Sequence, residues 1–235
     1  MPETIPLEAR EEGFPYLEEV IPNGKFDQAD NFLWQRGDPP FVLLNAHMDT
    51  KQHEDDVQMI LDDPNLIEET IERISGNGVQ VGFDDKCGLS IALAIVEETD
   101  LPLKLLFTVE EECGGNGIIN VERSEYDDVS FSLTLDRGGA IDIADRIPLF
   151  GRLAPKRFVK EMVKIGEERD LHRRRMDGRP CDAANIAQIV PAVNLSVGYC
   201  GAHASNDFCI KENVDGAMKF TMAIIEERGR LVDLL

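Results

Sequence analysis

The chain has 235 residues, of which 43% are hydrophobic, and its 45 acidic against 24 basic residues give a net charge of −21. The hydrophobic share is enough to form a core and excludes wholesale disorder, and no apolar run reaches the roughly 18 residues of a membrane span. The acidic balance disfavours binding to nucleic acid or anionic membranes, because both carry negative charge.

The pattern of short apolar runs alternating with amphipathic segments predicts an α/β fold with a mixed, mostly parallel sheet. We expect strands at 41–46, 103–109, 131–135 and 193–199, with a short strand at 79–81. We expect helices within 55–74, interrupted by Pro64, and at 88–98, 158–168, 183–189 and 214–231. Without repeats or linker-like segments, residues 1–235 are expected to form one three-layer domain, a sheet flanked by helices.

The five cysteines are an odd number with no CxxC pair, and the acidic N-terminus lacks the pattern of a signal peptide. Reduced thiols and a cytoplasmic location are therefore expected.

The most informative residues follow the predicted strands. His47 and Asp49 follow the first strand, and a triplet of glutamates, Glu110 to Glu112, follows the next strong one. Asp136 and His203 follow the remaining two, while the pair Asp84 and Asp85 opens a helix after a glycine-rich turn. Ligands of open α/β sheets bind outside the carboxyl ends of the strands, so these groups are expected to converge.

Clustered carboxylates repel one another, and their pKa values rise unless a cation neutralises them. Two histidines with three or more carboxylates suit zinc, and manganese or cobalt would also accept these donors. Two such ions can activate one water molecule and polarise a carbonyl, provided that another carboxylate takes the proton from the water. The pattern therefore indicates a two-metal hydrolase.

Five motifs in order resemble those of the co-catalytic dizinc peptidases, which include tripeptidase T, glutamate carboxypeptidase and related aminopeptidases. They are LNAHMDT, GFDDKCG, FTVEEECG, TLDRGG and GYCGAH, and they lie between Leu44 and His203. Each motif alone is weak, because HxD recurs by chance in many proteins. All five in this order, each at a predicted strand end or helix start, form a specific signal.

The resemblance implies a role for each matching residue. His47, Asp84, Glu112, Asp136 and His203 would bind the metals, with Asp84 bridging them and with His47 and Glu112 on different ions. Asp49 would orient His47, and Glu111 would be the general base that later protonates the leaving amine. Cys113 and Gly114 follow the family's glutamate pair, which places that pair at Glu111 and Glu112 rather than one residue earlier.

Each residue also has an ordinary structural interpretation. An HxD at a strand end is commonly a capped turn, a glutamate triplet is commonly a solvated patch, and Asp84 could cap a helix. Asp136 before two glycines is an ordinary turn. Only the joint pattern favours a metal site over these interpretations.

The one dense basic cluster, Arg173 to Arg175, is interpreted either as a solvated helix end or loop, or as a clamp for a substrate carboxylate. Asp182 lies in a segment that loosely resembles one near the family's substrate pocket.

The family's inserted second domain has no room here, because only 36 residues separate His47 from Asp84 and 66 separate Asp136 from His203. We therefore expect a catalytic domain without a lid, acting on a small peptide or acylated amino acid. The alternatives are an N-acyl amino acid deacylase with the same site, and a non-catalytic metal-binding or interaction protein derived from this family.

Overall fold

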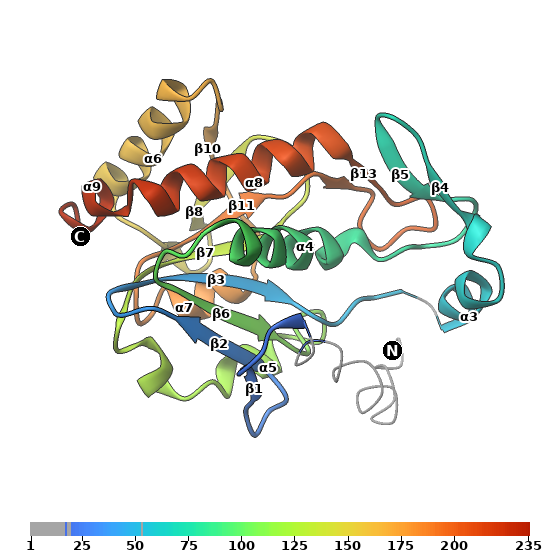
Figure 1. The fold of residues 1–235 in the computed structure, drawn as a ribbon, viewed down its shortest axis with the longest axis horizontal. Helices are drawn as coiled ribbons and strands as arrows, with labels where there is room; N and C mark the ends of the chain where they lie inside the picture. Colours follow the sequence, from blue (N-terminus) through green and yellow to red (C-terminus); the bar gives the residue numbers. More distant parts are fainter. Residues whose placement is uncertain (1–16, 18–19, 53) are drawn as a thin grey trace.

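The computed structural model describes residue 17 and residues 20–52 and 54–235. Within them, a nine-stranded sheet has the order β1-β2-β6-β3-β7-β11-β8-β10, with β9 paired to β8 (Figure 1). Its strands are β1 (Lys25–Phe26), β2 (Phe32–Arg36), β3 (Phe41–His47), β6 (Leu103–Thr108), β7 (Val129–Arg137), β8 (Asp142–Ile147), β9 (Gly151–Arg152), β10 (Arg174–Asp177) and β11 (Ala192–Ser196).

The four central strands β6, β3, β7 and β11 are parallel, and β2 and β8 flank them in antiparallel orientation. This confirms the predicted mixed sheet. In the register of the ladder, His47 lies opposite Thr108, and Asn45 lies opposite both Leu106 and Thr134. The strand ends that carry the proposed site residues are therefore neighbours in space.

Helices cover both faces of the sheet and make a three-layer arrangement (Figure 1). Helices α4 (Phe83–Glu98), α6 (Lys156–Glu168) and α8 (Lys211–Glu226) pack in the larger apolar core, whereas α5 (Asn116–Ile119) and α7 (Asp182–Ile186) pack in the smaller core. The other helical segments are α3 (Glu54–Asp62), α9 (Arg228–Val232) and two 3-10 helices, η1 (Pro64–Leu66) and η2 (Arg123–Tyr126).

The burial of the central strands follows from their side-chain alternation. Val42 and Leu44 of β3 belong to the larger core, whereas Leu43 between them belongs to the smaller one. Because both faces of these strands are covered, they read in the sequence as continuous apolar runs. Helix α6 buries one face only, with Phe158, Met162 and Ile165 at helical spacing.

Several predicted elements differ from the structure. Residues 67–74, expected to be helical, fall in a hairpin of β4 (Ile67–Glu69) and β5 (Arg73–Gly76), because β5 pairs with β13 (Phe208–Ile210). With β12 (Tyr199–Cys200) these strands make a second, antiparallel sheet. Residues 79–81 are not a strand, and the C-terminal helix is divided into α8 and α9.

The predicted absence of an inserted lid agrees with the described residues on both sides of the site. Residues 137–202 complete the sheet and its covering helices, and the described part of 48–83 forms α3, η1 and the β4–β5 hairpin. Among the described helices, none is both long and apolar enough to cross a membrane.

Candidate metal centre

His47 lies at the carboxyl end of β3 and is only 1% exposed, and its imidazole meets carboxylates from two other elements. Its Nε2 atom is 3.1 Å from Oδ1 of Asp84, at the start of α4, and 3.5 Å from Oδ1 of Asp136, near the end of β7. The convergence expected from the sequence is therefore present for these three residues.

Asp84 lies between two histidines that are far apart in the sequence. Its Oδ1 atom faces His47, whereas its Oδ2 atom is 3.4 Å from Nε2 of His203. The same nitrogen of His203 contacts Glu112, and the hydroxyl of Tyr199 also hydrogen-bonds to Asp84. The structure thus places two groups of potential ligands on either side of one carboxylate.

Asp49 ties the end of β3 to the loop after β6. The Nδ1 atom of His47 lies 2.8 Å from the Asp49 carbonyl oxygen and 3.5 Å from its carboxylate. The two oxygens of that carboxylate accept the backbone N–H groups of Glu111 and Glu112, both at 3.1 Å. Burial acts to raise the pKa of Asp49, but His47 and these N–H groups outweigh it and hold the pKa below its ordinary value.

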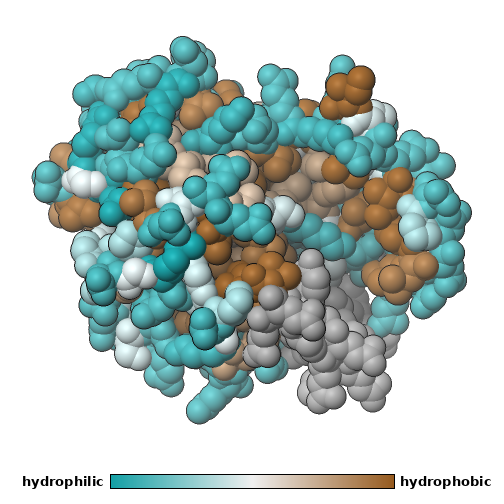
Figure 2. Space-filling model, in the orientation of Figure 1, coloured by the Kyte–Doolittle hydropathy of each residue, from teal (hydrophilic) through white to brown (hydrophobic). Residues whose placement is uncertain are grey.

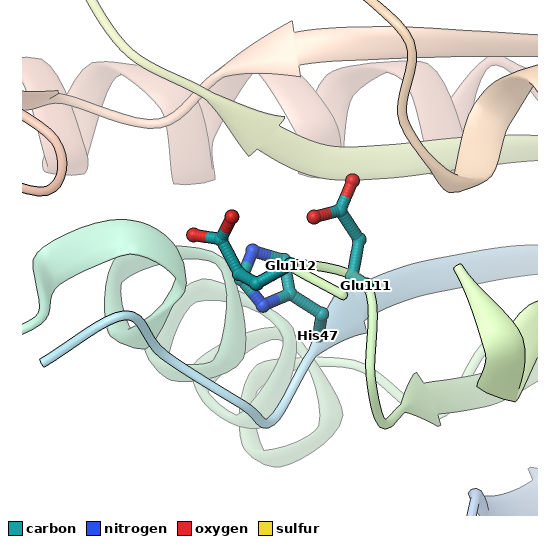
Figure 3. Close-up of side chains that lie close together, drawn as sticks. All are labelled: His47, Glu111 and Glu112. Atoms are coloured by element: carbon teal, nitrogen blue, oxygen red, sulfur yellow. The ribbon is translucent and has the colours of Figure 1, made fainter. Parts of the chain in front are cut away.

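The glutamate triplet is divided by the turn that follows β6. Figure 3 shows Glu111 and Glu112 beside His47 with both carboxylates extending past the imidazole, and ligand atoms of these three residues lie within 4.8 Å of one another. Glu110 has a left-handed backbone, with φ of 56°, and lines a surface cavity with Asp27 and other residues. Glu111 and Glu112 therefore lie near the imidazole of His47, whereas Glu110 lines the surface cavity.

In this cluster, Glu111, Asp136 and His47 all have raised pKa values. Burial raises the pKa of Glu111 to about 9, and the nearby charge of Asp136 adds to the shift. Burial likewise raises the pKa of Asp136 to about 6. Burial acts to lower the pKa of His47, but its hydrogen bonds with Asp136, Asp49 and Asp84 outweigh burial. The pKa of His47 is therefore well above the ordinary value.

This donor set fits divalent metal ions. Imidazole nitrogens and carboxylate oxygens are the ligands of zinc in catalytic sites, and a cation would relieve the repulsion that raises the acid pKa values. Three groups of ligand atoms are close enough to hold an ion: His47 with Glu111 and Glu112, His47 with Asp85 and Asp136, and Asp84 with Glu112 and His203. All five proposed ligands appear in at least one of these groups.

Asp85 has another role in the structure besides its closeness to His47. Its carboxylate accepts the backbone N–H of His47 at 3.3 Å and that of Gly88 at 2.9 Å. Burial raises its pKa well above the ordinary value. Asp85 and Asp84 are joined by a cis peptide bond and have non-helical dihedral angles within α4.

A buried polar network beneath the site did not emerge from the sequence. Asp182 of α7 accepts hydrogen bonds from Thr108 and from Asn45, whose own carbonyl accepts one from Thr134. The second Asp182 oxygen is buried without a partner among the described residues, and burial raises the pKa of this carboxyl. The signal available in the sequence was Asn45, a polar residue inside an apolar strand.

The basic cluster lies at the far edge of the sheet, where Arg174 and Arg175 belong to β10. Arg174 pairs with Asp142 at 2.7 Å, and Arg175 pairs with Asp145. Arg173 donates to the backbone carbonyl of Gly216 and lies over the ring of Phe220. The expectation of a helix end or loop was therefore wrong for Arg174 and Arg175, and all three side chains are engaged within the fold.

Comparison with known proteins gives structural matches only. No family model matches the sequence, and no curated protein sequence matches it. Aminopeptidase PepT from Bacillus cereus matches with a TM-score of 0.75 and 14% identity, over 94% of this chain and 94% of that one. A tripeptidase from Staphylococcus aureus gives 0.71 and 17%, covering 92% of both chains.

An aminopeptidase from the archaeon Desulfurococcus kamchatkensis gives a TM-score of 0.71 and 15% identity, over 93% of this chain and 90% of that one. At such low identity these matches concern the fold. The chain therefore has the fold of these two aminopeptidases and of this tripeptidase.

Proposed function

We propose that this protein is a metal-dependent exopeptidase acting on small peptides, with a pair of divalent ions bound at the carboxyl edge of the sheet. The observation that carries the proposal is the position of Asp84, whose two carboxylate oxygens face His47 on one side and His203 on the other. A carboxylate that faces two histidines could be shared by two metal ions. The peptidase fold of the matched structures adds support.

The remaining ligands divide between the two sides of Asp84. His47 and Asp136 would hold one ion, since Nε2 and Oδ1 are 3.5 Å apart. His203 and Glu112, which contact each other, would hold the other. Two imidazoles and three carboxylates favour zinc, and they also suit manganese or cobalt.

When bound, such ions lower the pKa of a water molecule and polarise the carbonyl of the scissile amide. Glu111 then accepts the proton of the attacking water and returns it to the nitrogen of the departing amine. Its partly buried position favours proton uptake, because desolvation disfavours its charged form. Asp49 keeps His47 oriented and holds the backbone of Glu111 in place.

The decisive test compares Glu111→Gln with Glu110→Gln, a matched change of the adjacent glutamate. We expect the Glu111 variant to keep about two ions per chain, measured by elemental analysis, while its turnover of a peptide library falls by about 10²–10⁴-fold. The Glu110 variant should retain turnover within about threefold, because Glu110 lies outside the ligand groups.

Near-normal hydrolysis by Glu111→Gln would show that Glu111 is not the general base. Two bound ions without hydrolysis by the unmodified protein, across peptides and N-acyl amino acids with added zinc, manganese or cobalt, would instead support a metal-binding protein without catalysis.

A further inference from the structure

The segment that leads into Asp84 is held by one buried carboxylate from the other end of the sequence. Asp207, which is 1% exposed, accepts the backbone N–H of Val81 on one oxygen at 2.8 Å. Its other oxygen accepts the N–H groups of Gly82 at 2.8 Å and Phe83 at 3.0 Å. Hydrogen bonds to a carboxylate are about twice as strong as neutral ones, so this contact is a firm restraint.

The carbonyl side of the same segment is also held. The Lys86 ammonium donates to the carbonyl of Val81 and, at 3.1 Å, to the side chain of Gln52, whose amide donates to the carbonyl of Gln80. Gly82 has φ of 76°, and a Cβ atom there would lie 2.7 Å from the hydroxyl of Thr50. The backbone before Asp84 therefore has little freedom to move.

Asp207 lies four residues after His203, so it also belongs to the loop that carries the second histidine. Its backbone N–H donates to the carbonyl of Ala204 at 3.0 Å, and that of Ala204 donates to Gly201 at 3.2 Å. One side chain thus links the turn of His203 with the segment of Asp84. These are the two residues whose facing atoms, Nε2 and Oδ2, are 3.4 Å apart.

We propose that Asp207 is a positioning residue for the metal site formed by Asp84, Glu112 and His203. It would fix the distance between Asp84 and His203. The inference rests on the proposed function. The competing interpretation is a helix cap that stabilises α4 and leaves the ligands where they are. The two differ in what happens to the folded protein when the carboxylate is replaced.

Asp207→Asn is the informative variant, because an amide keeps the size of the side chain but presents N–H groups where the backbone also presents N–H groups. Asp145→Asn is the matched control, since Asp145 is equally buried but pairs with Arg152 and Arg175 at the other side of the sheet. Cobalt titration of the metal-free proteins, followed by calorimetry and visible absorption, reports each site without requiring activity.

We expect Asp207→Asn to weaken one of the two cobalt sites by about 10–100-fold, the usual effect of losing a residue that supports a ligand, and to alter the absorption bands of that site. The turnover number should fall while KM changes by less than about threefold. Asp145→Asn should lower the melting temperature and leave both cobalt constants within about twofold.

Wild-type cobalt constants and spectrum in Asp207→Asn would overturn the inference and leave only the helix cap. An unmodified protein that binds no cobalt would overturn the proposed function as well, so the two failures are distinguishable. If Asp207→Asn does not fold, Lys86→Met acts on the same segment from the carbonyl side of its backbone. It should weaken the same site about threefold, and unchanged constants there would equally reject the inference.

Discussion

Two groups of buried or partly buried aspartates lie at different places in this sheet and have different partners. At the β8–β10 edge, Asp142 pairs with Arg137 and Arg174, and Asp145 pairs with Arg152 and Arg175. At the carboxyl edge of the central strands, Asp84 and Asp136 share the imidazole of His47 with other acids, and no arginine pairs with either of them in the described structure.

The presence or absence of arginine partners distinguishes the two groups of aspartates. Guanidinium groups neutralise carboxylates permanently and in a fixed geometry, so an arginine-paired cluster is a structural device. Burying ionised carboxylates without such partners lowers the stability of the folded state. The raised pKa of Asp136 reflects this unfavourable burial of its charged form. The face of the molecule in Figure 2 carries many hydrophilic residues, with hydrophobic ones between them.

The largest effect is expected from Asp84→Asn, which removes the shared carboxylate. Metal content should fall from about two ions per chain to one or none, and turnover should fall by about 10³-fold or more. Asp145→Asn should keep both the ions and the activity. Elemental analysis with a peptidase assay checks the pair. Retention of two ions by the Asp84 variant would contradict the bridging role.

A smaller effect is expected from pH. Metal binding requires His47 without its proton and Asp136 ionised, and the pKa of His47 is well above its ordinary value while that of Asp136 is about 6. Protons therefore compete with metal most strongly at low pH, and the apparent zinc affinity should rise at least about tenfold between pH 6 and pH 8. Calorimetry in buffers of different ionisation enthalpy measures the protons released. A pH-independent affinity would show that the acidic cluster does not hold the metal.

The smallest effect concerns the stability of the metal-free protein. Folding raises the pKa of Asp136 to about 6, so its ionisation costs stability once the pH exceeds the ordinary aspartate pKa, and the full cost is present above pH 6. At pH 8, Asp136→Asn should raise the free energy of unfolding by about 1–3 kcal/mol. Asp145→Asn should lower it by about 1–3 kcal/mol. Denaturant unfolding checks both, and effects of the same sign would remove the contrast between the two clusters.

The predicted helices and strands of the central sheet were largely correct because their patterns are strong and local. Strands β3, β6, β7 and β11 are apolar on both faces, and α6 has apolar residues at helical spacing. Strands β2, β8 and β10, which lie at or next to the edges of the sheet, were not predicted, because they carry polar and charged residues whose strand conformation depends on a neighbour. The β4–β5 hairpin was wrongly expected to be helical for the same reason.

In the candidate site too, some features could be predicted from the sequence and others could not. The types and order of His47, Asp84, Glu111, Asp136 and His203 could be recognised in the sequence, because metal chemistry restricts the residues that can serve and strand ends restrict where they occur. The partners of Asp207 and Asp182 could not be recognised, since they join residues more than 70 positions apart through backbone or buried groups.

The sequence by itself determined which histidines and acids make up the candidate site and the parallel sheet edge that carries them, because both depend on residue type and on local patterns of burial. Only the tertiary structure decided that the two oxygens of Asp84 face different histidines, and that Arg174 and Arg175 pair with aspartates of the fold. Such choices depend on contacts between distant segments, and these contacts form only when the packed layers bring the segments together.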